Sequence, residues 1–245
     1  MLMVQKFGGT SVSDPQRIAR VVSHLTGAAR QGHKVVGVVS AQGDLTDRLV
    51  KKMMALSPLP PPRESDACLA AGEQISAALV AMAVEAAGFP AVSLTGWQAG
   101  LVTDDVHSDA RIQMLQGRRI MDALEQGKIV IVAGFQGITP QGDITTLGRG
   151  GSDTTAVALA ALLGADECLI YTDVDGVYDK DPRMFPDAVK YSRIGYDEML
   201  QLCHRGAQVL HDRCVELAKK HRITIQVLST FRDLPGTTVA DSESL

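Results

Sequence analysis

Basic and hydroxyl side chains gather in two glycine-rich segments that lie far apart in the chain. The first, at residues 6–11, reads KFGGTS and follows an apolar stretch. The second, at residues 148–155, reads GRGGSDTT and precedes an apolar run. Both lead into a predicted helix N-terminus, where unpaired backbone N–H groups bind anions. Because each also carries a basic residue, Lys6 or Arg149, the pair suggests a cleft for nucleotide phosphates facing a carboxylate substrate.

Other arrangements of reactive residues have less support. Glycine pairs also occur in ordinary turns that need positive φ, and neither segment has the spacing of a Walker A loop or a Rossmann fingerprint. The six histidines are scattered and form no convincing Ser-His-Asp triad. Four aspartates within residues 173–181 are followed by Pro182, which does not fit an EF-hand, so no metal held directly by protein ligands is predicted.

Further motifs, which follow one another in a defined order along the chain, make the interpretation of the two segments more specific. They are KFGGTS, Gly72-Glu73 in an alanine-rich helix, VAGFQGIT at 132–139, TTLGRGGSDTTA at 145–156, and YTDVDGVY at 171–178 with DPR at 181–183. Together, over about residues 4–238, they resemble the catalytic domain of aspartokinases, in the amino acid kinase family. The resemblance implies ATP- and Mg²⁺-dependent phosphorylation of the side-chain carboxylate of L-aspartate to 4-phospho-L-aspartate, the first step toward lysine, threonine and methionine.

By the same resemblance, each matching residue has an expected role. Catalysis is assigned to Lys6, which stabilises the transferring phosphoryl group, and to Asp153, which orients the lysine or a metal ion. The expected acceptor contacts are Thr46, Glu73, Arg149, Gly150, Gly151 and Ser152. The expected ATP contacts are Lys6, Phe7, Gly8, Gly9, Thr172, Asp173, Tyr178, Arg183 and Gln208.

The residue types support part of this assignment. A carboxylate acceptor is already ionised at pH 7, so transfer needs positioning and charge neutralisation rather than a general base. Glu73 stands in an otherwise largely apolar helix and requires a partner, which the resemblance identifies as the ammonium group of aspartate. Purely structural roles also stay open for three of these residues: Lys6 as a solvent-exposed lysine, and Thr46 and Asp153 as helix caps.

Gln208 departs from the family pattern, which usually has an ATP-binding lysine at this position. Loss of one preorganised electrostatic contact typically slows a reaction by ~10²–10³. Arg205, Lys180 and Arg213 are candidates to supply the missing charge, which the sequence by itself does not show. Two alternatives are therefore left open: a kinase for another amino acid or carboxylate, and a weakly active or non-catalytic nucleotide-binding subunit.

The length of the chain is a second departure. Most aspartokinases continue into ligand-binding regulatory domains of the ACT type, whereas this sequence ends at Leu245. We expect a chain without these domains, and leave open whether it is naturally short or truncated.

Composition sets the remaining expectations. Of the 245 residues, 45% are hydrophobic and 4% aromatic, with a net charge of −4, so a large aliphatic core can be buried. No basic cluster, signal sequence or membrane-length apolar run is recognisable, so we expect a cytoplasmic protein that binds neither nucleic acid nor membrane. The four separated cysteines are expected to be buried free thiols. A homodimer is left open.

Alternating strands and helices must position these residues, which favours an α/β protein with a parallel sheet. Strands are predicted at residues 2–5, 35–39, 91–94, 129–133, 167–171 and 224–228, with hairpins at 97–105 and 138–146. Helices are predicted from 14 and at 45–56, 64–87, 117–126, 153–163, 196–203 and 207–221. The family resemblance implies a three-layer αβα sandwich with a mainly parallel central sheet. Residues 1–245 would form one domain, with an acceptor-binding lobe to about 135 and a nucleotide-binding lobe from about 136.

Overall fold

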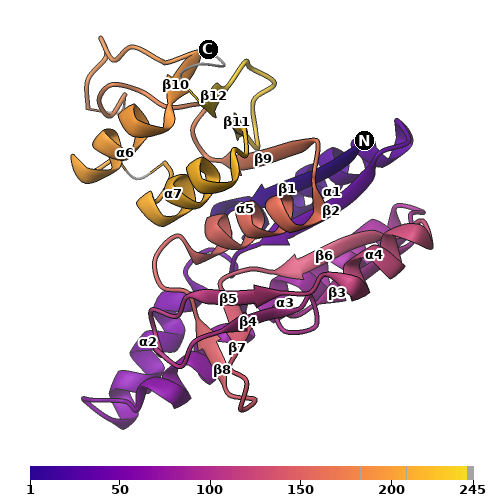
Figure 1. Cartoon of the computed structure of the whole chain (residues 1–245), viewed down its shortest axis with the longest axis vertical. Helices are drawn as coiled ribbons and strands as arrows, with labels where there is room; N and C mark the ends of the chain where they lie inside the picture. The colour runs from indigo at the N-terminus through magenta and orange to yellow at the C-terminus, as the bar shows by residue number, and fades with distance from the viewer. Residues whose placement is uncertain (183, 208, 242–245) are drawn as a thin grey trace.

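The computed structural model describes residues 1–182, 184–207 and 209–241 and has an eight-stranded sheet at its centre (Figure 1). In spatial order the strands are β10 (Arg193–Gly195), β12 (Thr237–Ala240), β11 (Ile225–Ser229), β9 (Glu167–Thr172), β1 (Leu2–Phe7), β2 (Lys34–Val39), β6 (Ile129–Ala133) and β3 (Ala91–Leu94). Neighbouring strands are parallel except β11 and β12. The predicted mainly parallel sheet is confirmed.

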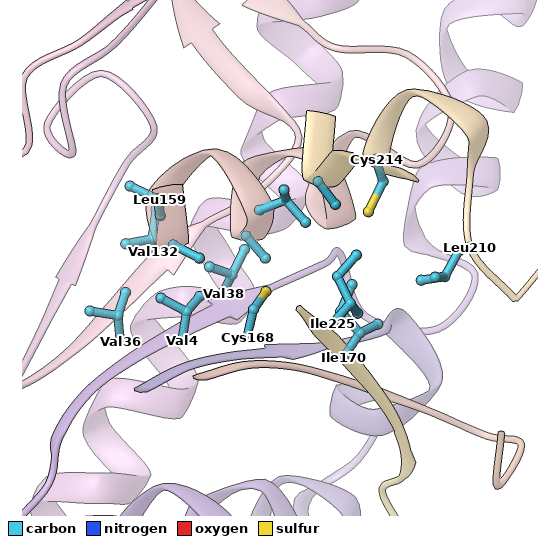
Figure 2. Packing of buried hydrophobic residues seen from close by; sticks show 14 of the residues in the cluster. Val4, Val36, Val38, Val132, Leu159, Cys168, Ile170, Leu210, Cys214 and Ile225 are labelled. Carbon is cyan, nitrogen blue, oxygen red and sulfur yellow. The ribbon is translucent and has the colours of Figure 1, made fainter. Parts of the chain in front are cut away.

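Helices cover both faces of this sheet. α1 (Pro15–Arg30) and α3 (Pro62–Ala86) pack on one face, against Phe7 and Val39. On the other face lie α4 (Arg118–Glu125), α5 (Gly151–Leu163), α6 (Tyr196–His204) and α7 (Asp212–His221). Figure 2 shows this second face, where Val38 and Val132 of the sheet face Leu159 of α5. Alternate strand residues thus enter opposite cores, which gives the predicted three layers.

A smaller four-stranded sheet lies in the lower part of Figure 1. Its order is β5 (Ile112–Leu115), β4 (Leu101–Thr103), β7 (Gln136–Ile138) and β8 (Ile144–Thr146). β7 and β8 form the predicted hairpin. The hairpin predicted within residues 97–105 is wrong, because that segment makes a turn at Gly100, with φ +92, and supplies only β4. Its antiparallel partner is β5, a strand that the sequence analysis did not predict.

Helix boundaries follow local chemistry. α1 begins as predicted, since the Asp14 side chain accepts a hydrogen bond from Arg17 N at 2.9 Å and Pro15 occupies the first turn. α7 begins at Asp212 rather than at residue 207. The residue before it, His211, has an extended backbone with φ −92 and ψ 147, which interrupts the predicted helix. α2 (Leu45–Leu56) has no buried residue and lies outside both cores.

α3 is the one described helix that is long and apolar enough to cross a membrane by length and composition. It serves as a core helix, with Val80 and Val84 buried in the cluster that also contains residues of β3 and β6. A β-carbon on Gly72 would lie 2.8 Å from Ala41 Cβ, so glycine allows α3 to approach the loop after β2. This approach brings Glu73 beneath that loop.

The four cysteines are free thiols, as predicted. Burial raises the pKa of Cys168 to about 12 and holds that of Cys214 well above its ordinary value. Cys68 and Cys203 are half-buried rather than buried. The two fully buried thiols therefore act as small core residues, as Figure 2 shows.

Candidate active site

Many of the predicted site residues meet at the carboxyl ends of β1, β2, β6 and β9, where open α/β sheets bind ligands. Two adjoining cavities, of about 560 and 570 Å³, open there. We call the first the Glu73 pocket and the second the Tyr178 pocket, after one residue in each lining. Thr172 and Val209 line both, so the two pockets form one continuous cleft.

Lys6 and Asp153 form an ion pair in the lining of the Glu73 pocket. Lys6 Nζ lies 2.6 Å from Asp153 Oδ1, and the two side chains are 12% and 8% exposed. Asp153 lies in the first turn of α5, whose N-cap is Gly150. Lys6 is therefore not a solvent-exposed lysine and Asp153 is not the N-cap of α5, so the two purely structural roles left open by the sequence are excluded. A cation fixed in this way can neutralise a bound anion without first being ordered.

The second glycine-rich segment turns the N-terminus of α5 toward the Glu73 pocket. Gly150 has φ +67, and a β-carbon there would collide with the His211 ring. A β-carbon on Gly151 would lie 2.9 Å from Phe135 Cδ2. Ser152 and Asp153 follow in the first helical turn and join the lining, at the end of the helix whose N–H groups favour anions.

Glu73 brings a buried carboxylate to the same pocket. It is 4% exposed, and its Oε1 accepts a hydrogen bond from Ala41 N at 3.0 Å. Its Oε2 has no hydrogen-bond partner among the described residues. Burial raises the pKa of Glu73 to about 7, against the opposing effect of the Ala41 hydrogen bond. A buried carboxylate oxygen without a donor suits an incoming cationic group.

Arg149, Thr46 and Ser152 line the pocket with Glu73. Arg149 is exposed and makes no ion pair with a described residue, so its guanidinium is available to a carboxylate. The N-cap of α2 is Asp44, which excludes the reading of Thr46 as the cap. Besides the Lys6–Asp153 pair, the pocket therefore presents the Arg149 guanidinium and the Glu73 carboxylate to a ligand.

Loop residues build the Tyr178 pocket. Thr172 ends β9, Asp173 and Tyr178 follow it, and all three line this pocket. Arg205 and Ala207, which follow α6, complete this part of the lining. The Tyr178 hydroxyl donates to Asp175 Oδ1 at 2.9 Å. Burial, together with this hydrogen bond, raises the pKa of Tyr178.

Several predicted residues do not line either cavity. Phe7 is fully buried and stacks on Tyr171, with ring centroids 4.8 Å apart, so only its backbone is available to a ligand. Gly8 precedes the short helix η1 (Gly9–Val12). A β-carbon on Gly9 would lie 2.5 Å from Ala41 O, so this glycine serves close chain packing. Arg183 and Gln208 lie outside the described residues.

The three cations considered as substitutes for a lysine at position 208 differ in placement. Arg205 lines the Tyr178 pocket and has no ion pair to a described residue. Lys180 also lines it, but pairs with Asp187 at 2.6 Å. Arg213 donates to Leu147 O at 2.8 Å and pairs with Asp109. Arg205 is therefore the best placed of the three.

Sequence reasoning missed part of the Glu73 pocket, namely Ser40, Leu69, Ser108, Phe135, Thr146 and His211. Two of these have left-handed backbones, with φ +70 at Ser108 and +72 at Phe135. In the described ranges the one other non-glycine residue with positive φ is Arg222. Backbone strain of this kind is concentrated at ligand sites. The residue types serine and phenylalanine do not indicate a left-handed backbone, so the sequence did not reveal it.

The described residues include no group of three or more His, Cys, Asp or Glu side chains that could hold a metal ion. The joined pockets instead provide a paired lysine, a helix N-terminus, a free guanidinium and a buried carboxylate. These groups can bind two ligands end to end and stabilise an anionic group that passes between them.

Known proteins share this arrangement of elements. Residues 1–229 match the model of a family described as the amino acid kinase family. The aspartokinase of Mycobacterium tuberculosis (strain H37Rv) is 52% identical over 242 residues, which cover 98% of this chain and 58% of the relative. The chain thus spans about three-fifths of the length of the curated relatives it matches.

Two solved structures resemble the whole described fold. The aspartate kinase of Synechocystis has a TM-score of 0.87 and 46% identity, covering 98% of this chain and 40% of that one. E. coli aspartokinase III in complex with aspartate and ADP has a TM-score of 0.87 and 26% identity, covering 98% and 65%.

Proposed function

Because the chain belongs to the amino acid kinase family, we propose that it transfers the γ-phosphoryl group of ATP to the side-chain carboxylate of L-aspartate, giving 4-phospho-L-aspartate and ADP. Aspartate occupies the Glu73 pocket and ATP the Tyr178 pocket, so transfer takes place near their junction at Thr172. The aspartokinase relatives, and a relative solved with aspartate and ADP, support this choice.

The observation that carries the proposal is the unpartnered Oε2 of Glu73 in the same lining as Arg149. Free amino acids carry both an ammonium and a carboxylate group. Glu73 accepts the ammonium group, and Arg149 binds one carboxylate through its planar fork. The second carboxylate of aspartate is then left to face the nucleotide.

Catalysis rests on positioning and charge. The acceptor carboxylate is ionised at pH 7 and needs no general base. Lys6 stabilises the charge that spreads over the transferring phosphoryl group, and Asp153 keeps its ammonium group in place. The first turn of α5 adds backbone N–H groups on the same side.

Mg²⁺ is expected to enter with ATP. This ion commonly uses one or two carboxylates together with substrate phosphates and water. Asp153 in the Glu73 pocket and Asp173 in the Tyr178 pocket offer such carboxylates, so the donor chemistry fits. When bound, the ion neutralises phosphate charge. We further propose a cytoplasmic enzyme of amino-acid biosynthesis.

A coupled assay of ADP release with a panel of amino acids and carboxylates tests this function. We expect turnover with L-aspartate and little with glutamate, asparagine or acetate, and turnover slowed by ~10²–10³ in Lys6→Met protein. Preference for another acceptor would change the substrate, and ATP binding without turnover on any compound would contradict the kinase proposal.

A further inference from the structure

The segment at residues 104–110 runs beside the Glu73 pocket and contributes Ser108 to it. Ser108 lines the same cavity as Glu73 and Arg149. Its backbone has φ +70, a conformation that costs a residue with a β-carbon on the order of 1 kcal/mol or more. The Ser108 hydroxyl makes no hydrogen bond to a described residue, so no hydrogen bond of this side chain within the fold offsets the strain.

A buried aspartate on α3 imposes that conformation. Asp66 is fully buried and accepts hydrogen bonds from Ser108 N at 3.1 and 3.0 Å, one to each carboxylate oxygen. It also contacts His107 Nδ1 at 2.9 Å and accepts a hydrogen bond from Thr146 Oγ1 at 2.6 Å. The Ser108 N–H is thereby turned toward α3, while the residue itself remains exposed at the pocket.

The opposite side of the segment is tied to the loop that presents Arg149. Ala110 N donates to Thr146 O at 2.9 Å. A β-carbon on Gly148 would lie 2.8 Å from Asp109 Oδ1, so the two chain segments are in close contact. Arg213 joins them by donating to Leu147 O and pairing with Asp109. Ser108 is therefore fixed relative to Arg149 on both sides.

We propose that Ser108 is an acceptor-binding residue and that Asp66 is the positioning residue that places it. The Ser108 hydroxyl donates to a carboxylate oxygen of the bound amino acid, beside the Arg149 guanidinium. A third fixed donor beside Arg149 holds that carboxylate in one orientation, so that the other carboxylate of aspartate faces the nucleotide. The inference rests on the proposed function, because it requires an amino-acid acceptor in the Glu73 pocket.

Ser108→Gly and Ser108→Ala test the hydroxyl in two backbone contexts. Both should raise the KM for aspartate roughly tenfold, the effect of losing one hydrogen bond to a charged group, and leave the KM for ATP within about twofold. Ser108→Gly should keep or raise Tm, because glycine adopts positive φ freely. Arg222→Gly is the matched control, since it relieves the same strain outside both pockets and should leave both KM values unchanged.

A double-mutant cycle tests Asp66. Asp66→Asn should lower Tm and raise the KM for aspartate. In Ser108→Gly protein the same substitution should raise that KM little further, because both changes remove the same contact with aspartate. If the double variant instead shows the product of the two single effects on KM, Asp66 does not act through Ser108.

The reference for these measurements is Glu73→Ala, which should also raise the KM for aspartate. If it does so and neither Ser108 variant does, the inference is wrong and the proposed function stands. If the panel assay selects another acceptor, the proposed substrate is wrong, and the Ser108 variants are judged with that acceptor.

Discussion

The Glu73 pocket and the Tyr178 pocket hold their charged groups in different ways. Glu73 and Asp153 are buried on α3 and α5 and are fixed by core packing. Asp173 and Arg205 of the Tyr178 pocket are exposed, one on a loop and one at the end of α6. Buried charges interact strongly and are costly to leave unpaired, whereas exposed ones are screened. We infer that removing one of these charges has a large effect in the first pocket and a small one in the second.

The largest effect is expected at Lys6. Lys6→Met should lower kcat by ~10²–10³, because it removes a preorganised cation from the reacting group. It should also lower Tm, since Asp153 loses its partner. Steady-state kinetics and thermal melting measure both. Lys34→Met, at an exposed position on β2, is the control, and kcat within threefold of wild type in Lys6→Met would contradict the assignment.

Gln208 gives the next largest effect and concerns the nucleotide side. Gln208→Lys should raise kcat, by up to roughly 10²-fold, while ATP affinity changes little, because the added charge acts mainly in the transition state. Single-turnover kinetics would show the gain. A fast wild-type enzyme that this substitution leaves unchanged would indicate that Arg205 already supplies the cation, and Arg205→Met should then slow it.

Glu73→Gln sharpens the difference between the pockets. Loss of a charge-assisted contact to ammonium should raise the KM for aspartate roughly 10–100-fold and leave that for ATP unchanged. Initial rates at varied concentrations of each substrate separate the two. Equal damage to both constants would mean that Glu73 supports the cleft as a whole rather than the acceptor.

The pH dependence follows from the same residue. The pKa of Glu73 is about 7 in the fold against an ordinary 4.5, so the native protein holds an extra proton between these values. Stability of the empty protein therefore falls as pH rises through this window, by roughly 3 kcal/mol in all. Glu73→Gln should raise Tm relative to wild type more at pH 8 than at pH 5. In wild type the KM for aspartate should rise as pH falls below about 7, and in the variant it should stay flat.

The smallest effect is expected for Asp173. Asp173→Asn should raise the KM for ATP by less than about fivefold, because the side chain is exposed and its charge is screened. Measuring that KM at low and high salt checks the reason as well as the size. A loss as large as that of Glu73→Gln would remove the proposed contrast between the two pockets.

Much of the fold was predictable from local patterns. The strands of the large sheet that carry the site contain short apolar runs, and Asp14-Pro15 marks the start of α1. The sequence analysis missed β10, β12 and β5 because three or four residues leave too little pattern. The pairing of β10 with β12 also joins segments that are distant in sequence. The start of α7 was misplaced because the extended backbone at His211 has no signal in the local residue pattern.

The sequence alone determined the family and the parallel three-layer architecture, and it singled out Lys6, Glu73 and Arg149 as candidate site residues, because these follow from residue types in long specific motifs. The tertiary structure decided which groups are paired and which are free. Lys6 forms an ion pair with Asp153, although the two are far apart in sequence. The backbone N–H of Ser108 donates to Asp66, which lies on another element. Such contacts have no sequence period, because burial and strain are set by segments that become neighbours only on folding.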